Sequence, residues 1–521
     1  MDKNLYKIKI LKGEKSLQIN TDIHSTIFDA LKKIKALSFY TPCMGRGLCG
    51  KCKIIMVRGK VTKPDKNELA LLNSWELKKG YRLACMTKVL DDIEIKLIST
   101  DFNMFILTQG IKRDICINPV IKKKFLTIKQ ADINNQKSDI TRIKEKLSVK
   151  EIHVPLNIAK KVHQVITKSN LKVSLVYSPK QIIAIESGNT TKYFYGLAID
   201  IGTTTIVIYL VDINENKVLD VISEINSQTQ YGSNVISRIQ FTIEHKNGLN
   251  TLYKNIITQI NRMIAKLARQ NNINFQHIYS MVCTGNTVMT HLFCNLPVAQ
   301  IAVSPFIPVT TDELTYQAAE MGININPEAQ VTILPGIAGY VGADIVADIL
   351  ATGMAENDEL SLLVDIGTNG EVIIGNKKGL LCCSTAAGPA FEGGHISKGI
   401  SSVDGAIYSV CIEKNHISYK TINHQPPVGI CGTGIIDCIA VFKKLGIIDE
   451  TGRITNKKHK ILKNSILDIN GEKAIIITRE NKKNGPLYVT QKDIREVQLA
   501  KAAIAAGIKI LIKKEKRLLM I

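Results

Sequence analysis

The sequence predicts a multidomain protein that combines an α+β domain with α/β domains. Three observations support this prediction. The chain has 521 residues, and a single hydrophobic core rarely serves more than about 300 residues. Short strands with alternating polar and apolar residues surround a cysteine-rich loop near the N-terminus. A pattern of strand, glycine turn and strand occurs twice farther along, as two α/β lobes of related fold would show.

The composition limits the classes of function. Hydrophobic residues make up 45% of the chain, no apolar run reaches the roughly 18 residues of a membrane-spanning helix, and the start lacks the apolar stretch of an export signal. We therefore expect a cytoplasmic protein with no membrane partner. The net charge is +22, but the lysines are spread along the chain without interleaved aromatic residues, so no nucleic-acid partner is expected. The 12 cysteines are expected to be reduced thiols, some of them holding metal.

The first elements of residues 1–100 are predicted to be a β-hairpin and a helix. Residues 7–10 and 16–19 alternate polar and apolar side chains on either side of a short turn, which is typical of paired strands. Ser25 and Thr26 precede apolar residues at helical spacing. Their hydroxyl groups can accept hydrogen bonds from the exposed N–H groups of a helix start.

Four cysteines in this region predict an iron–sulfur site. They are Cys43, Cys49, Cys52 and Cys85. The spacing is C-x5-C-x2-C-x32-C, with the first three in one glycine-rich loop. A 2Fe–2S cluster needs four thiolates, and its loop must turn tightly so that backbone N–H groups point at the sulfurs. The glycines that permit such turns are Gly45, Gly47 and Gly50.

A four-cysteine zinc site and unligated thiols are the alternatives. Zinc sites of this kind usually pair two C-x2-C turns, whereas Cys85 stands alone. The loop is also longer and richer in glycine than a zinc turn. The region resembles the 2Fe–2S ferredoxins of the β-grasp fold, and its five-residue first gap is more similar to the adrenodoxin type than to the plant type. The resemblance implies a ferredoxin domain over residues 1–100.

A linker and a small α/β domain are expected next. Residues 101–121 have weak periodicity and one isolated cysteine, Cys116, which we interpret as an inert thiol. Residues 122–195 contain a helical stretch at 156–167 and two strand-like runs between 172 and 185. No group of residues in this middle domain predicts catalysis.

A repeat in the remaining region predicts two phosphate-binding turns. In each copy an apolar strand ends in aspartate and turns through glycine and hydroxyl or amide residues into a second strand. Glycine lets backbone N–H groups approach phosphate, hydroxyls add donors, and the aspartate can hold Mg²⁺ or orient water. The first turn contains Asp200, Gly202, Thr203, Thr204 and Thr205, and the second contains Asp365, Gly367, Thr368 and Asn369. A single such turn also occurs in ordinary hairpins, but two copies indicate two related lobes that hold one polyphosphate.

A third glycine-rich segment opens an apolar helix that is predicted to run to about Leu445. Its characteristic residues are Gly432, Thr433, Gly434 and Asp437. Glycines let a helix start approach a nucleoside or phosphate, and the helix dipole favours negative charge there. The alternative is that these glycines serve helix packing alone.

These segments resemble the superfamily of actin, sugar kinases and heat-shock-70 ATPases, often called ASKHA. The resemblance implies that residues 200–205 form the first phosphate turn, residues 365–369 the second, and residues 432–437 the adenosine turn. Asp200 and Asp365 would be the catalytic residues of a two-lobed ATPase domain over 196–521.

The order of domains is similar to that of the reductive activators of corrinoid proteins. Segments 230–238, 285–290 and 387–393 also resemble that family, although Asn234 stands where we expect aspartate. The resemblance implies an enzyme that transfers one electron from its 2Fe–2S cluster to cob(II)alamin on a corrinoid protein of a methyl-transfer pathway, giving cob(I)alamin. ATP and Mg²⁺ would drive the transfer. An upstream electron donor is also implied, and a homodimer is left open.

Two other functions remain open at this point. A metabolite kinase fused to a ferredoxin would need a carboxylate base beside a hydroxyl-bearing substrate. A non-enzymatic binding module would respond to nucleotide and redox state without turnover. Phosphate release from ATP, with and without small-molecule acceptors, distinguishes these alternatives.

The C-terminal end departs from the family pattern. Thr490 lies three positions before Asp493 at the start of a helix expected to reach about Lys513. Members of the family continue with another strand and a glycine-rich turn, and residues 513–521 resemble neither. We therefore expect an incomplete second lobe with an exposed strand edge and weak nucleotide binding.

Overall fold

The computed structural model describes most of the chain. The described residues are 5–12, 15–34, 45, 47, 50, 52–72, 74–97, 113, 118–148, 151–413, 416–455, 465–469, 471–479 and 485–518. The chain forms two compact units. One comprises residues 1–107, 229–238 and 354–521, and the other comprises residues 108–228 and 239–353.

The N-terminal region folds into a five-stranded sheet with the order β2-β1-β5-β3-β4. Its strands are β1 (Leu5–Lys12), β2 (Lys15–Asp22), β3 (Lys53–Arg58), β4 (Tyr81–Leu83) and β5 (Ile93–Leu97). Its helices are α1 (Ile27–Lys32), α2 (Lys66–Leu71) and α3 (Ser74–Lys78). The predicted hairpin is confirmed, because β1 and β2 pair antiparallel with Ile8 opposite Ile19. The predicted helix start is also confirmed, because Thr26 Oγ1 accepts a hydrogen bond from Asp29 N at 3.1 Å.

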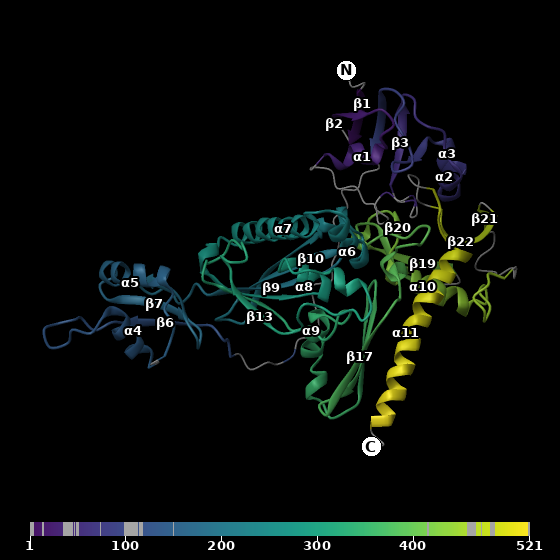
Figure 1. The fold of residues 1–521 in the computed structure, drawn as a ribbon. Helices are drawn as coiled ribbons and strands as arrows, with labels where there is room; N and C mark the ends of the chain where they lie inside the picture. The colour runs from purple at the N-terminus through teal and green to yellow at the C-terminus, as the bar shows by residue number, and fades with distance from the viewer. Residues whose placement is uncertain are drawn as a thin grey trace. The chain divides into compact units, whose positions relative to one another are not determined.

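The second unit begins with a three-stranded antiparallel sheet covered by two helices (Figure 1). The sheet contains β6 (Lys122–Thr127), β7 (Lys172–Tyr177) and β8 (Ile182–Ser187), and the helices are α4 (Asp139–Leu147) and α5 (Leu156–Lys168). Burial of Ile143, Val162, Ile166 and Leu175 forms their common core. The helix and strands expected in this region are therefore present.

A six-stranded sheet with the order β11-β10-β9-β12-β14-β13 forms the main part of the second unit. Its strands are β9 (Tyr195–Ile201), β10 (Thr205–Asp212), β11 (Lys217–Ile225), β12 (Ile278–Thr284), β13 (Leu314–Gln317) and β14 (Gln330–Ile333). The helices of this region of the sequence are α6 (Val235–Glu244), α7 (Gly248–Gln270), α8 (Thr287–Phe293) and α9 (Ala343–Thr352). Helix α7 packs on β10 and β11 through an apolar face that includes Ile256, Ile260 and Ile264 (Figure 1).

The C-terminal region contains three sheets of three strands each among the described residues. The first contains β15 (Ser361–Ile366), β16 (Gly370–Asn376) and β17 (Gly379–Thr385); the second contains β18 (Ala406–Glu413), β19 (His416–Thr421) and β20 (Gly429–Ile430); the third contains β21 (Ile466–Ile469), β22 (Glu472–Thr478) and β23 (Leu487–Thr490). The helices are α10 (Gly432–Lys444) and α11 (Gln491–Leu518). Helix α10 packs on β18, and α11 packs along β16 and β17 (Figure 1).

Short 3₁₀ helices connect several of these elements. They are η1 (Ser227–Gln230), η2 (Phe275–His277), η3 (Ala299–Ala302), η4 (Met354–Glu356), η5 (Pro389–Glu392) and η6 (Ile422–His424). Within the described parts of the chain, no helix combines the length and the apolar character that a membrane span requires.

The predicted start of the last helix is confirmed in atomic detail. Thr490 Oγ1 accepts a hydrogen bond from Asp493 N at 3.1 Å, and Asp493 Oδ2 accepts one from Thr490 N at 2.8 Å. This reciprocal pair is a capping box, with aspartate in the place of glutamate. The second oxygen of Asp493 accepts a hydrogen bond from Ser397 N at 2.7 Å. One carboxylate therefore ties the start of α11 to the segment that follows η5.

Candidate functional site

Two of the four predicted cluster ligands lie side by side. Cys52 precedes β3 and is 1% exposed, and Cys85 follows β4 and is partly buried. Their Sγ atoms are 3.2 Å apart, which is well beyond the roughly 2.05 Å of a disulfide. A backbone hydrogen bond of 2.8 Å from Ala84 N to Cys52 O holds the two segments together. Cys43 and Cys49 lie outside the described residues, as does Cys116.

The glycines of the cysteine loop have the conformation that the sequence predicts. Gly45, Gly47 and Gly50 have φ angles of 82°, 72° and 64°, in the left-handed region that favours glycine. At Gly45 an added Cβ would lie 2.5 Å from the ring of Phe28 and 3.5 Å from Cys85 Cβ. Gly45 therefore lies against α1 and next to Cys85. The neighbouring thiols of Cys52 and Cys85 and the left-handed glycines fit a 2Fe–2S cluster, whose ligands are cysteine thiolates.

A buried ion pair fixes the segment that carries Cys85. Arg82 donates from Nε and Nη2 to the two oxygens of Glu68, both at 2.9 Å, and Leu83 N donates to Glu68 Oε1 at 2.7 Å. The side chain of Glu68 is 0% exposed and that of Arg82 is 9% exposed. Asp65 caps the start of α2, which carries Glu68. The pair thus connects α2 to the residues that precede Cys85.

Replacing Arg82 by methionine should destabilise the N-terminal domain by about 3–5 kcal/mol, because the charge of Glu68 would remain buried without its partner. Urea unfolding followed by the fluorescence of Trp75, the single tryptophan of the sequence, would measure the change. Lys9→Met is the matched control. It removes a 3.1 Å pair with Glu94 in which the lysine is 52% exposed, and it should cost at most about 1 kcal/mol. Equal effects of the two substitutions would contradict the prediction.

The first predicted phosphate turn is the connection between β9 and β10. These strands pair antiparallel with Ile201 opposite Ile206, and residues 202–204 lie between the end of β9 and the start of β10 and form the tip. Asn226 clamps the tip from one side: its Nδ2 donates to Gly202 O at 2.8 Å, and its N–H donates to Thr204 O at 2.9 Å. The side chain of Asp200 lies just before the tip, at an exposed position.

The side chain of Asn286 contacts the same turn from the other side. Its Nδ2 donates to Thr203 Oγ1 at 2.9 Å. Its Oδ1 accepts a hydrogen bond from Met289 N at 3.1 Å, which caps α8. No role was predicted for this residue, although an asparagine directly before a helix is a common cap. Helix α8 is therefore attached to the predicted phosphate turn through its cap.

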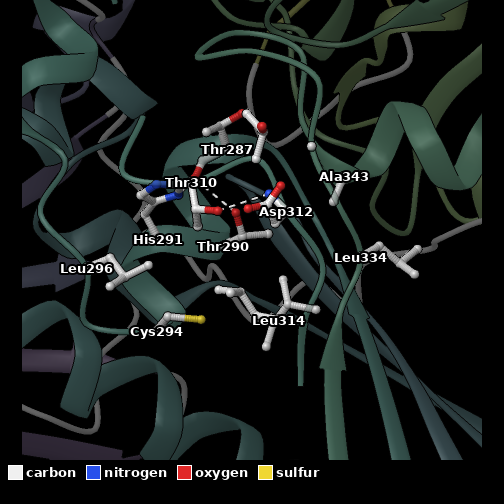
Figure 2. A pocket seen from close by; sticks show the side chains of 13 residues that line it. Thr287, Thr290, His291, Cys294, Leu296, Thr310, Asp312, Leu314, Leu334 and Ala343 are labelled. Atoms are coloured by element: carbon white, nitrogen blue, oxygen red, sulfur yellow. Dashed lines mark hydrogen bonds between the residues drawn. The ribbon is translucent and has the colours of Figure 1, made fainter. Parts of the chain in front are cut away.

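A small cavity lies beside α8 (Figure 2). Its volume is about 20 Å³, and Thr287, His291, Thr310 and Asp312 are among its polar lining residues. His291 donates from Nδ1 to Thr287 O at 2.7 Å and accepts at Nε2 from Val309 N at 3.1 Å. Acceptance at Nε2 requires a neutral ring, and burial lowers the pKa of His291 accordingly. This cavity has room for one water molecule and is too small for a nucleotide.

A larger cavity of about 330 Å³ lies elsewhere in the second unit. Its lining includes Asn157, Glu186, His277 and Glu328, and it contains none of the residues predicted from the sequence. Glu186 is paired with the buried Nζ of Lys123 at 2.8 Å. These contacts attach β8 to the six-stranded sheet through Tyr279, whose OH lies 3.0 Å from the same Nζ.

The second predicted phosphate turn connects β15 to β16. Gly367 N donates to Asn369 O at 3.0 Å, which closes the turn. Thr368 Oγ1 donates to Glu392 Oε2 at 2.6 Å. Burial raises the pKa of Asp365 and of Glu392, and the negative charge of Asp365 raises the pKa of Glu392 further, against the hydrogen bonds from Thr368. The charge of Asp365 therefore acts on the ionisation of Glu392 at this turn.

Glu392 was not among the predicted site residues. It ends η5 in the segment 387–393, whose resemblance to a family was noted without a role for this side chain. It is the single acidic residue of that segment, and this was the sequence signal that could have marked it as a site residue. Carboxylate oxygens are ligands that Mg²⁺ prefers, so Glu392 joins Asp365 as a candidate.

The third glycine-rich segment begins α10, as predicted. Its glycines make close approaches: an added Cβ would lie 1.6 Å from Phe391 O at Gly432 and 2.2 Å from Ile407 O at Gly434. Thr433 Oγ1 donates to Tyr408 O at 2.8 Å, and Asp437 Oδ2 accepts from Val410 N at 3.0 Å. The described contacts thus bind α10 to β18 and η5. An adenosine contact at these residues remains a prediction.

The predicted sites fall into both compact units. The cysteine pair and the second turn belong to one unit, and the first turn belongs to the other. Among the residues that the structure describes, no group of three His, Cys, Asp or Glu side chains could hold a metal ion. Of the four predicted cluster cysteines, the described residues include only Cys52 and Cys85.

Matches to four family models define the class of protein as an iron–sulfur domain joined to an ASKHA domain. Residues 12–90 match the 2Fe-2S iron-sulfur cluster binding domain, 110–192 the RACo linker region, 195–357 the RACo middle region, and 359–518 the C-terminal domain of RACo, described as the ASKHA domain. These matches confirm the predicted ferredoxin-like and ASKHA folds. The region interpreted as a middle domain, 122–195, lies largely within the match to the linker region.

Relatives and a solved structure identify the family. The corrinoid activation enzyme RamQ of Eubacterium limosum is 31% identical over 499 residues, covering 94% of this chain and 81% of RamQ. A [Co(II) methylated amine-specific corrinoid protein] reductase of Methanosarcina barkeri is 26% identical over 345 residues, covering 60% of this chain and 58% of that protein. The structure of a reductive activator for corrinoid, iron-sulfur protein matches with a TM-score of 0.71 and 31% identity, covering 98% of this chain and 84% of that one. The chain belongs to the family of reductive activators of corrinoid proteins and is a redox enzyme.

Proposed function

We propose that this protein transfers one electron to cob(II)alamin on a corrinoid protein, giving cob(I)alamin, in a reaction driven by ATP. The observation that carries the proposal is the combination, in one chain, of the neighbouring thiols of Cys52 and Cys85, the left-handed glycines Gly45, Gly47 and Gly50, and two phosphate-type turns. Two relatives are named for corrinoid activation and for reduction of a Co(II) corrinoid protein, and these names support a corrinoid protein as the substrate.

The cluster ligands in this proposal are Cys43, Cys49, Cys52 and Cys85. A bound 2Fe–2S cluster supplies the single electron of the reaction. The protein's contribution is to deprotonate and orient the four thiols and to direct loop N–H groups at the sulfurs. The ion pair of Glu68 and Arg82 holds the segment of Cys85 in place for that purpose.

The nucleotide ligands are proposed to be the residues of the two turns and of the start of α10. Backbone N–H and hydroxyl groups at 202–205 and 367–369 would donate to phosphate oxygens. Asp200, Asp365 and Glu392 offer carboxylate oxygens to Mg²⁺ or to the attacking water. Residues 432–437 would contact the adenosine. None of these roles requires a covalent nucleophile.

ATP is needed in this proposal for a thermodynamic reason. For one electron, each ~59 mV of mismatch between donor and acceptor lowers the equilibrium constant tenfold, and a gap of about 100 mV is roughly 2.3 kcal/mol. A ligand can shift a conformational equilibrium only by its difference in affinity for the two states. ATP would therefore favour a complex in which the cobalt coordination has changed and the cobalt couple has moved upward.

Several finer points belong to the same proposal. The corrinoid partner would serve a methyl-transfer pathway, and an upstream protein would reduce the cluster. The enzyme would act in the cytoplasm. A homodimer is the oligomeric state left open by the proposal. The proposed domains are a ferredoxin domain at 1–100, a linker at 101–121, a middle domain at 122–195 and an ATPase domain at 196–521.

The test is anaerobic incubation of the reconstituted protein with a chemical reductant and a corrinoid protein in the cob(II) state. We expect the cob(II)alamin spectrum to disappear with MgATP and to persist with MgADP or without nucleotide. An unchanged cob(II) spectrum in the presence of ATP would contradict the proposal. ADP formation that requires a small hydroxyl-bearing acceptor, with the γ-phosphoryl group transferred to that acceptor, would instead indicate a kinase.

A further inference from the structure

The side-chain amide of Asn286 joins the start of α8 to the first predicted phosphate turn, with its oxygen bonded to one and its nitrogen to the other. Its Oδ1 accepts from Met289 N at 3.1 Å, and its Nδ2 donates to Thr203 Oγ1 at 2.9 Å. The first contact settles the orientation of the amide, since a backbone N–H can only face the oxygen. The second contact therefore makes the hydroxyl oxygen of Thr203 an acceptor toward Asn286.

This contact restricts the direction in which Thr203 can donate. A threonine hydroxyl has one proton and two acceptor lone pairs. Because Asn286 donates to one lone pair, the proton of Thr203 points away from the amide. The side-chain rotamer of Thr203 is held at the same time. At a phosphate-type turn, a donor with a fixed direction is worth more than a freely rotating one, because no ordering is needed when the anion binds.

The position of Asn286 is itself fixed by the start of α9. Gly285 O accepts hydrogen bonds from Ala343 N at 3.0 Å and Asp344 N at 3.2 Å. Gly342 packs directly on Asn286: an added Cβ at Gly342 would lie 2.5 Å from Asn286 Cα. The backbone that carries the amide is thus pinned between two helix starts, which is the kind of support that a precise site requires.

We infer that Asn286 is a positioning residue that aims the Thr203 hydroxyl at a phosphate oxygen of the bound nucleotide. The inference rests on the proposed function, because it names a further determinant of the same nucleotide site. Asn286 acts through Thr203 and needs no contact of its own with the nucleotide. Its contribution should appear only for ligands that carry phosphate.

Asn286→Ser separates this role from helix capping. Serine caps a helix about as well as asparagine, but its side chain is too short to carry an amide donor to Thr203. We expect the Kd for MgATP, measured by calorimetry on the full chain, to rise about tenfold, as for loss of one hydrogen bond to a charged group. The Kd for adenosine and the thermal unfolding midpoint should stay at their wild-type values. Asn214→Ser is the matched control, because Asn214 lies in an exposed turn of the same unit and contacts Thr191 O.

Thr203→Val is a second variant that tests whether Asn286 acts through the Thr203 hydroxyl. It should weaken MgATP binding to a similar extent, and the double variant with Asn286→Ser should show no further loss, because both substitutions act through the same Thr203 hydroxyl. Additive losses, or equal weakening of adenosine and MgATP, would overturn the positioning role. Wild-type protein that fails to bind MgATP would instead refute the proposed function, and the two failures are therefore distinguishable.

Discussion

Replacing Cys85 by alanine should abolish cob(II)alamin reduction while leaving MgATP binding unchanged. Cys85 provides one of the two thiols that converge at 3.2 Å, and a 2Fe–2S cluster cannot be held fully by the three remaining cysteines. Iron content per chain and visible absorption after anaerobic reconstitution would report the loss of the cluster. The same preparation in a calorimeter would report nucleotide binding.

Cys411→Ala is the control for this experiment. Cys411 is a partly buried thiol of β18 that lies 3.6 Å from Glu413, and it has no part in the predicted cluster site. The control should keep its iron, its colour and its activity. Retention of both iron and activity in Cys85→Ala would refute the cluster assignment, and zinc in place of iron in the wild-type protein would favour the alternative metal site.

Replacing Asp365 by asparagine should lower ATP hydrolysis by about a hundredfold, the size of effect seen when one well-placed electrostatic group is removed from an active site. The proposed reason is the loss of a carboxylate that organises Mg²⁺ beside Glu392. Phosphate release at saturating MgATP would measure the rate. Asp358→Asn is a suitable control, because Asp358 has a 74% exposed side chain in an ion pair with Lys377 at 2.6 Å.

The same substitution should alter the pH dependence of MgATP binding. Burial raises the pKa of Asp365 above its ordinary value of 3.8 and that of Glu392 above 4.5. Protonated carboxyls do not bind Mg²⁺, so the affinity of the wild-type protein should rise as the pH rises through the range just above those values. This rise should be smaller in Asp365→Asn. An identical pH profile would show that Asp365 does not titrate with binding.

The parts of the site that the sequence predicted are those in which neighbouring residues act together. The glycines of the cysteine loop and the Thr490–Asp493 capping box are local patterns, and the described residues of both adopt the expected conformation. The two strand–turn–strand hairpins are also local, since each turn connects strands adjacent in the sequence. Sequence periodicity contains this information because period-2 burial and turn chemistry are properties of short segments.

Residues that act through distant contacts were not predicted. Asn286 is 83 positions from Thr203, and Glu392 is 24 positions from Thr368. Glu68 similarly meets Arg82 through the approach of α2 to β4. Such pairs depend on how elements pack, and a single sequence carries no record of the packing. The glycines at the start of α10 were predicted to approach a nucleotide. The structure shows that they also pack closely against Phe391 and Ile407, and these contacts depend on distant segments that a local pattern does not identify.

The carboxylate of Asp493 has a mechanical consequence. It accepts hydrogen bonds from Thr490 N at 2.8 Å and from Ser397 N at 2.7 Å. Displacing the segment after Glu392 would therefore break the bond from Ser397 to the same carboxylate that caps the first turn of the 28-residue helix α11. As long as both bonds are kept, that segment and the start of α11 move together.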